Sequence, residues 1–205
     1  MKHIFKAGKE GNHKTLLMLH GTGGTENDLL QVAELIDPNA AVLSVRGNVL
    51  EQGMSRFFKR LREGVFDEED LKKQTNELNT FLAEAAEEYS FDRRKVIAVG
   101  YSNGANIAGS LLFHFQDSLE GALLFHPMVP IRGVDLPNLT GTPIFIGAGE
   151  NDPICSSEET KELHALLQSA GAEVKVHWEE RGHQLTQSEV LAAKDWYKEL
   201  FSAQD

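Results

Sequence analysis

Residues Lys95–Gly109 read KVIAVGYSNGANIAG and place three features in a fixed order. An apolar, β-branched run comes first, then a serine between two glycines, then a segment of small residues. The first run is typical of a buried strand, and the small residues are typical of a closely packed helix. Gly100-Tyr-Ser-Asn-Gly104 also matches G-x-S-x-G, the sharp strand-to-helix turn that exposes a reactive serine. We therefore predict that Ser102 is a nucleophile at the carboxyl end of a strand.

On both sides of this segment, short apolar runs alternate with helical patterns. The expected strands are Leu16–Leu19, Ala41–Val45, Val96–Val99, Ala122–Phe125, Pro143–Ile146 and Val174–Trp178. The expected helices are Asp28–Leu35, Leu71–Tyr89, Ala105–Phe115, Ser157–Ser169 and Ser188–Phe201, with Ser156 or Ser157 as a helix start. This alternation predicts a mostly parallel central sheet with helices on both faces. Together with the serine turn, it indicates an α/β-hydrolase fold in one domain over residues 1–205, without a large cap domain.

A glycine-rich turn follows the first of these strands. His20-Gly-Thr-Gly-Gly24 can bring bare backbone N–H groups close to a ligand. Acyl transfer needs such donors for the oxyanion of its tetrahedral intermediate. We expect the N–H groups of Thr22 and Asn103 to be these donors. A phosphate-binding loop is the alternative, but neither G-x-G-x-x-G nor G-x-x-x-x-G-K is present.

An acid and a base follow Ser102 in the order that this fold uses. Asp152 comes just after the Pro143–Ile146 strand, and His183 comes just after Val174–Trp178. The carboxyl ends of parallel strands share one edge of the sheet, so all three side chains should meet there. We predict that His183 is the base and that Asp152 orients it. Glu150 is the alternative acid.

Three other residues near this edge have simpler interpretations. His20 precedes the nucleophile, and we expect it to be a structural histidine that bonds to the backbone. His126 ends the Ala122–Phe125 strand, and we expect it to line the substrate pocket. Cys155 is expected to be a small buried side chain.

The substrate pocket should be built from loops at the same edge. The irregular segment from Arg46 to Asp70 is predicted to be a long connection, and long connections in compact domains are usually functional or disordered. The candidate pocket residues from it and from the turn after Phe125 are Met54, Phe57, Phe58, Phe66, His126, Met128 and Val129. Arg46 and Arg56 either orient a polar group of the substrate or form ion pairs within the loop.

Composition excludes several classes of function. A net charge of −11 without a basic stripe argues against nucleic-acid binding. No apolar run approaches the roughly 18 residues that a membrane span needs, and the first 14 residues hold four lysines and no apolar core, so we expect neither membrane insertion nor a signal peptide. Cys155 is the single cysteine, which leaves no internal disulfide and no thiolate zinc cluster. We therefore expect a cytoplasmic protein that needs no metal or other cofactor.

HGTGG, GYSNGA, GENDP and RGH, in this order and spacing, resemble the phospholipase/carboxylesterase family of α/β-hydrolases. That family is close to the acyl-protein thioesterases and the dienelactone hydrolases. Its bacterial carboxylesterase branch is also similar in three further segments, Arg46-Gly47, Arg56-Phe57-Phe58 and Gly64–Asp70. The resemblance implies a compact, metal-free hydrolase of modest-sized esters that often forms homodimers. Dienelactone hydrolases have a cysteine nucleophile where this chain has Ser102, which argues against their activity. The eukaryotic thioesterases have Gln where this chain has Asn103.

The sequence thus predicts a serine carboxylesterase that hydrolyses short-to-medium small-molecule esters through an acyl-enzyme on Ser102. An acyl thioesterase or a lysophospholipase-like enzyme is the alternative within the same class. A non-catalytic binding scaffold is the alternative from another class. Such scaffolds usually lack one of the three catalytic residues, and all three are present here.

Overall fold

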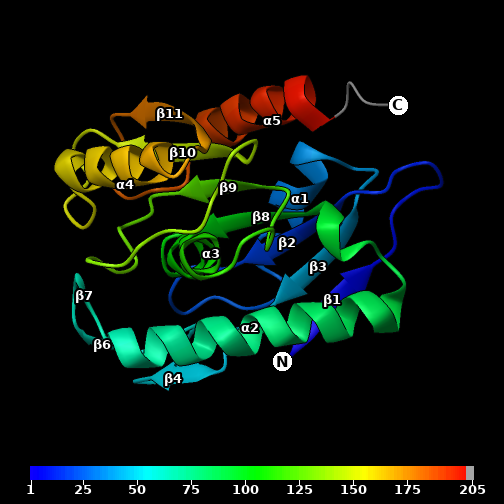
Figure 1. Ribbon diagram of the computed structural model, residues 1–205, viewed down its shortest axis with the longest axis horizontal. Coiled ribbons are helices and arrows are strands. Elements are labelled where there is room, and N and C mark those ends of the chain that lie inside the picture. The colour runs from blue at the N-terminus through cyan, green and yellow to red at the C-terminus, as the bar shows by residue number, and fades with distance from the viewer. Residues whose placement is uncertain (202–205) are drawn as a thin grey trace.

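A computed structural model describes residues 1–201, so the last four residues of the expected 1–205 domain lie outside the described residues. Its centre is a seven-stranded sheet with the order β1-β3-β2-β8-β9-β10-β11 (Figure 1). The strands are β1 (His3–Lys6), β2 (Thr15–Leu19), β3 (Ala41–Val45), β8 (Val96–Tyr101), β9 (Gly121–Phe125), β10 (Pro143–Gly149) and β11 (Glu173–Glu179). All neighbours in the sheet are parallel except β1, which is antiparallel to β3. The sheet confirms all six expected strands.

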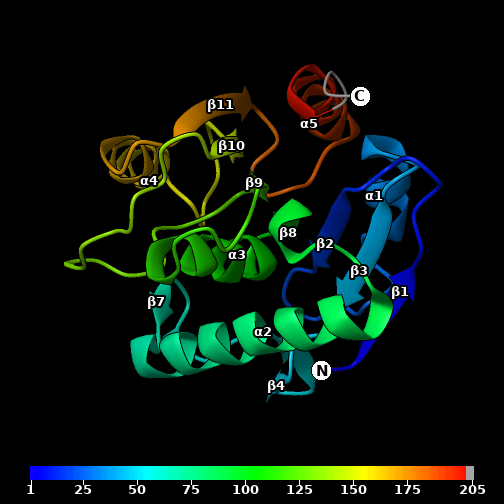
Figure 2. The same cartoon turned by 45° about the vertical axis from the view of Figure 1, so that its right-hand side comes forward.

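Helices cover both faces of this sheet. They are α1 (Leu30–Ile36), α2 (Glu68–Tyr89), α3 (Asn103–His114), α4 (Ser157–Ser169) and α5 (Gln187–Phe201), with a short 3-10 turn η1 (Arg93–Lys95) before β8. Figure 2 shows α1 and α5 together on one side of the sheet and α2 and α3 on the other. The expected starts of α1, α2, α3 and α5 differ from the observed ones by one to three residues. At α2 a cap sets the start, because Asp67 accepts from the N–H of Asp70. The expected start of α4 at Ser157 is confirmed, and Ser156 caps it by accepting from the N–H of Glu159.

Alternation along the buried strands divides the core between the two faces. In β2, Leu17 and Leu19 pack in the cluster that includes α2, α3 and α4, whereas Leu16 and Met18 pack in the cluster with α1 and α5. The same alternation runs through the other central strands, because successive side chains of a strand point to opposite faces. A sheet that is apolar on both faces explains why these strands appear in the sequence as continuous hydrophobic runs.

The segment from Arg46 to Asp70 is not the unstructured connection that its sequence suggests. It forms two small antiparallel hairpins, β4 (Val49–Glu51) with β5 (Met54–Arg56) and β6 (Arg60–Arg62) with β7 (Val65–Phe66). Strands of two or three residues are too short for an alternating pattern to be recognised. The turn at Gln52 and Gly53 has positive φ at both residues, as tight hairpins require.

None of the helices within residues 1–201 combines the length and the apolar composition that crossing a membrane requires.

Candidate active site

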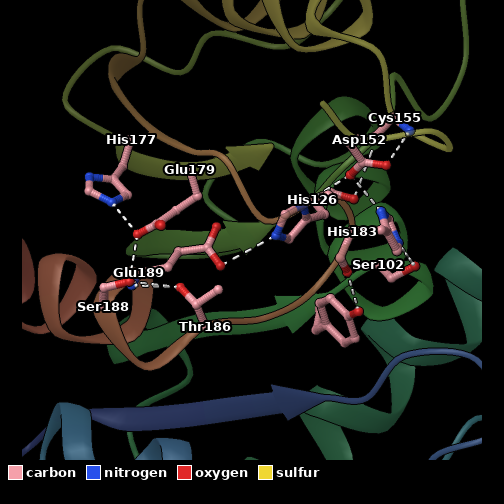
Figure 3. A network of polar contacts seen from close by, with 12 residues as sticks. Ser102, His126, Asp152, Cys155, His177, Glu179, His183, Thr186, Ser188 and Glu189 are labelled. Carbon is pink, nitrogen blue, oxygen red and sulfur yellow. Dashed lines mark hydrogen bonds and ion pairs between the residues drawn. The ribbon is translucent and has the colours of Figure 1, made fainter. Parts of the chain in front are cut away.

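Four adjacent parallel strands, β8, β9, β10 and β11, carry the site at their carboxyl ends. Ser102 follows β8, His126 follows β9, Asp152 follows β10 and His183 follows β11. Parallel pairing brings these ends to one edge of the sheet, and Figure 3 shows the side chains converging there. The sheet topology therefore brings together residues that are up to 81 positions apart in sequence.

Ser102 is held in a sharp turn between β8 and α3. Its backbone has φ 51° and ψ −113°, outside the common regions for a residue with a side chain. The helix after it can approach the sheet closely because residue 104 is glycine, and a Cβ there would collide with the carbonyl of Leu19. The turn presents the Ser102 hydroxyl at the amino-terminal end of α3, where the helix dipole favours negative charge.

His183 contacts both other predicted residues. Its Nε2 lies 2.8 Å from Ser102 Oγ, and its Nδ1 lies 2.7 Å from Asp152 Oδ2. A carboxylate only accepts hydrogen bonds, so Nδ1 carries the hydrogen and Nε2 is free to accept the Ser102 proton. The predicted set of Ser102, Asp152 and His183 thus has the geometry of a nucleophile, a base and an orienting acid.

Asp152 is held as an anion by backbone donors. Its Oδ1 accepts from the N–H of Ile154 at 2.8 Å and of Cys155 at 2.9 Å. Burial alone would raise the pKa of Asp152, but these two N–H groups and His183 outweigh it and hold the pKa below its ordinary value. Glu150, the alternative acid, is exposed. The structure therefore favours Asp152 as the partner of His183.

The loop after β2 lies against the nucleophile turn and is fixed by β5 and the residues after it. The N–H of Gly23 donates to the carbonyl of Ser55 at 2.8 Å, and Arg56 Nη1 donates to Thr22 Oγ1 at 2.6 Å. The N–H of Phe57 donates to Asn103 Oδ1 at 2.7 Å. Thr22 and Asn103 line one cavity together with Ser102. Since Asn103 opens α3, its N–H has no acceptor in the preceding turn of that helix.

The cavity beside Ser102 and His183 has a volume of about 280 Å³. Its apolar surface comes partly from Phe66, Met128 and Ile154, and its polar surface partly from Arg56 and Arg60. Phe66, Arg56 and Arg60 all belong to the two hairpins or lie at their ends. Residues of the Arg46–Asp70 segment thus border the cavity, and His126 and Met128 are among its lining residues.

Four expected pocket residues lie elsewhere. Val129 is buried in the core cluster and is not part of the cavity lining. Phe57 and Phe58 have no exposed surface and belong to the core, where Phe57 packs on His20 and Phe58 packs edge-on against Phe66. Met54 is partly exposed at the β4–β5 turn and is not part of the cavity lining. The sequence pattern failed here because these aromatics anchor the hairpins to the sheet instead of facing the substrate.

The two arginines that were expected to orient substrate or form ion pairs both form ion pairs. Arg56 Nε lies 3.1 Å from Glu51 within the loop, as expected, whereas Arg46 pairs with Glu26, which lies outside the loop and away from the cavity. Arg56 also lines the cavity, so a role in orienting substrate remains a prediction for it.

His20 and Cys155 are structural, as expected. The N–H of Gly47 donates to His20 Nε2 at 3.1 Å, and His20 Nδ1 lies 2.6 Å from the carbonyl of Gly21. Burial lowers the pKa of His20, which suits a neutral ring bonded to backbone. The thiol of Cys155 is buried and donates to the carbonyl of Pro127 at 2.8 Å, and burial raises its pKa far above the ordinary value.

His126 has an environment that the sequence did not reveal. Its Nδ1 lies 3.0 Å from Asp152 Oδ2, and its Nε2 lies 3.3 Å from Glu189 Oε2 in α5. All three side chains have no exposed surface. Glu189 was missed because an acid in the first turn of a helix is usually an exposed residue that favours the helix dipole.

His126, Asp152 and His183 are also close enough together to be tested as metal ligands, with candidate ligand atoms within 4.8 Å of one another. The two Nδ1 atoms face the same carboxylate oxygen. A nitrogen that donates its hydrogen to a carboxylate has no lone pair left for a cation. The three groups therefore fit a hydrogen-bonded network better than a metal centre.

Comparisons with known proteins agree with this site and fold. A model of the dienelactone hydrolase family matches residues 49–195. The chain is 60% identical over 199 residues to the putative hydrolase MhqD of Bacillus subtilis (strain 168), covering 97% of this chain and 98% of that protein. It is 63% identical to a solved carboxylesterase of Bacillus cereus, with a TM-score of 0.96 over 97% of this chain and 94% of that one.

A third similar protein is YahD, whose structure was solved with malic acid. It is 35% identical, with a TM-score of 0.92 over 97% of this chain and 98% of that chain. These likenesses confirm the α/β-hydrolase fold and the resemblance to bacterial carboxylesterases that the sequence indicated. With its fold, the family match and these identities in agreement, the chain belongs to the dienelactone hydrolase family of hydrolases.

Proposed function

We propose that this protein is a serine carboxylesterase that hydrolyses short-to-medium carboxylic esters through an acyl-enzyme on Ser102. The observation that carries the proposal is the unbroken contact from Ser102 Oγ through His183 to Asp152, at 2.8 Å and 2.7 Å. The 63% identical protein from Bacillus cereus is itself described as a carboxylesterase, which supports the same assignment.

The first half of the reaction follows from these contacts. Ser102 Oγ attacks the ester carbonyl carbon while its proton passes to His183 Nε2. The carbonyl oxygen becomes an oxyanion, for which the N–H groups of Thr22 and Asn103 are the proposed donors. When the tetrahedral intermediate collapses, the bond to the alkoxy oxygen breaks, and the alcohol leaves with the proton from His183.

The second half releases the acid. A water molecule gives a proton to His183 Nε2 and attacks the acyl carbon, and a second tetrahedral intermediate forms. Its collapse breaks the bond to Ser102 Oγ, which recovers the proton from His183. Asp152 keeps Nδ1 protonated throughout and stabilises the imidazolium that forms twice in each cycle.

The shape of the cavity supports short-to-medium acyl chains. Only 49 residues separate Ser102 from Asp152, and they contain α3, β9 and β10, so no cap domain is inserted there. The hairpins border a cavity of about 280 Å³ with both apolar and charged lining. Each methylene that stays in water forgoes about 0.8 kcal/mol of transfer free energy. Rates should therefore rise over the first acyl carbons and then fall.

A series of p-nitrophenyl esters from acetyl to palmitoyl tests this proposal. We expect the largest kcat/KM at a short-to-medium length and no jump in rate above the substrate's micelle concentration. Met128→Phe should narrow the cavity and shift the preference towards acetyl, whereas Leu50→Ala, at an exposed hairpin position outside the cavity lining, should not. A preference for palmitoyl esters would contradict the proposal. Matched thioesters in the same assay separate an esterase from the thioesterase alternative.

A further inference from the structure

The proposed mechanism uses one of the two histidines that contact Asp152 and gives no role to the other. His126 Nδ1 lies 3.0 Å from the same carboxylate oxygen that contacts His183, and His126 Nε2 lies 3.3 Å from Glu189. Dashed lines in Figure 3 join the whole series from Glu189 through His126, Asp152 and His183 to Ser102. A buried pair of this kind costs free energy unless its charges compensate each other, so it calls for an explanation.

The contacts of His126 indicate a charged ring. Each of its nitrogens faces a carboxylate oxygen, and an ionised carboxylate can only accept. Both nitrogens therefore carry hydrogen when both acids are ionised, which makes the ring an imidazolium between two anions. Burial lowers the pKa of His126, but the contact and charge of Glu189 and then of Asp152 outweigh it, so that the pKa lies above its ordinary value.

The other groups that face His126 do not compete for this charge. The His183 ring lies edge-on at 5.1 Å and the Tyr101 ring at 6.1 Å between centroids. The Cys155 thiol faces the backbone carbonyl of His126, not its ring. Asp152 and Glu189 are therefore the anions that the ring meets directly.

The carboxylate of Glu189 is buried beside β10, in space that a glycine leaves open. Gly147 in β10 leaves the space that the carboxylate fills, because a Cβ on residue 147 would collide with Glu189 Oε1. The N–H of His126 donates to the carbonyl of the same Gly147 at 2.7 Å, although this places His126 at φ 53°. Such a conformation costs free energy in a residue with a side chain and tends to occur at functional sites. The pair is thus fixed from both β9 and β10.

From this geometry we infer that His126 and Glu189 are positioning residues, which clamp Asp152 from the side opposite the catalytic base and set the pH at which that base acts. The inference rests on the proposed function, because it assigns a role relative to His183 and Ser102. The positive ring of His126 lies between Glu189 and Asp152, so it is nearer to His183 than the balancing negative charge of Glu189 is. The ring thereby offsets part of the attraction that Asp152 exerts on a proton on His183.

The double variant His126→Asn/Glu189→Gln tests this role. Asn keeps an N–H donor near the position of Nδ1, and both substitutions remove a charge while nearly preserving volume. We expect the midpoint of the rising limb of kcat/KM against pH to move up by about half a pH unit, because a single charge at this distance shifts a pKa by about one unit and the loss of the Glu189 charge offsets part of that. Below the wild-type midpoint, kcat/KM should fall about threefold, while KM should stay within about twofold.

The chain provides a matched control pair. His177 Nε2 lies 3.1 Å from Glu179 at the end of β11, as Figure 3 also shows, and this pair does not contact Asp152. His177→Asn/Glu179→Gln should therefore leave the pH midpoint unchanged. An unshifted midpoint in the folded His126→Asn/Glu189→Gln variant, or an effect confined to KM, would overturn the inference in favour of simple pocket lining. If the double variant does not fold, His126→Asn alone, which leaves the negative charge of Glu189 in place, should show a larger upward shift.

The charge of His126 can also be measured without any variant or substrate. Nitrogen NMR of the wild-type protein at pH 7 should show both ring nitrogens of His126 protonated. A neutral ring would overturn the inference even if the enzyme is active. If the wild-type protein hydrolyses no ester although His126 is charged, the proposed function is wrong, whereas the ion pair between His126 and Glu189 is still supported.

Discussion

The two histidines that share Asp152 Oδ2 lie on opposite sides of the boundary between solvent and core. The His183 side chain is 16% exposed and follows β11 in a loop, and its second partner is the neutral hydroxyl of Ser102. The His126 side chain has no exposed surface and directly follows β9, and its second partner is the carboxylate of Glu189. The two residues are both histidines and contact the same carboxylate oxygen, so their different roles must come from their burial and from their second partners. A base needs access to substrate and a partner that can give up a proton, and only His183 has both.

The largest expected effect separates the two histidines by removing each in turn. His183→Ala should lower kcat about 10⁴-fold, because the members of such a triad act as a unit. His126→Ala should leave most of that catalysis, with a loss of no more than about 100-fold, because Ser102, His183 and Asp152 all remain. Steady-state kinetics on p-nitrophenyl acetate, with circular dichroism to check folding, would compare them. If the two variants exchange their effects, His126 is the base and the assignment is wrong.

A second prediction concerns a substitution that affects only Glu189, the buried partner of His126. Gly147→Ala places a methyl group against the Glu189 carboxylate, and overpacking of this kind costs about 1–3 kcal/mol of unfolding free energy. Thermal denaturation should detect it as a Tm lower by several degrees. In a Glu189→Ala background the same substitution should cost less, because the collision with the carboxylate is gone. Equal costs in both backgrounds would show that Glu189 does not fill this space.

A smaller effect is expected in the pH dependence of stability, to which His126 and Asp152 should contribute in opposite directions. The raised pKa of His126 means that its contribution is complete below the unfolded-state value, about 6.5, and is lost as the pH rises through the folded-state value. The urea midpoint of the wild type should therefore fall between pH 6 and pH 9 by more than that of His126→Asn. Parallel curves for the two proteins would contradict an ion pair at His126. The lowered pKa of Asp152 acts oppositely, so its contribution is lost only as the pH falls through the acid range.

The smallest expected effect is that of metal removal. The proposed mechanism moves protons between Ser102, His183 and substrate and assigns no step to a cation. Dialysis against EDTA should leave kcat/KM within error of the untreated enzyme. A loss of activity that added metal restores would show that the cluster of His126, Asp152 and His183 is used differently.

Sequence reasoning succeeded where one local signal was tied to the topology of the sheet. The apolar runs predicted β2, β3, β8, β9, β10 and β11, and the parallel arrangement then predicted that Ser102, Asp152 and His183 would share an edge. Their contacts at 2.8 Å and 2.7 Å agree with that expectation. Helix ends were less accurate because caps such as Asp67 set them.

The parts that the sequence did not reveal depend on contacts between distant segments. The hairpins after β3 have strands too short to show a period, and the β1 edge strand is only partly buried. Phe57 and Phe58 look like pocket residues in a glycine-containing loop, but packing against the sheet decides that they are core. The partnership of His126 and Glu189 spans β9 and α5, and its one local sign was Gly147, a glycine within a buried strand.

Labelling with a fluorophosphonate probe tests the central claim, that Ser102 is the nucleophile of a serine hydrolase, most directly. Intact-protein mass spectrometry of the wild type should show one adduct, which peptide mapping places on Ser102. Ser102→Ala should take up no probe, keep its fold and lose kcat about 10⁴-fold or more. Labelling of Ser102→Ala to the same extent, or ester hydrolysis that survives the substitution, would contradict the account.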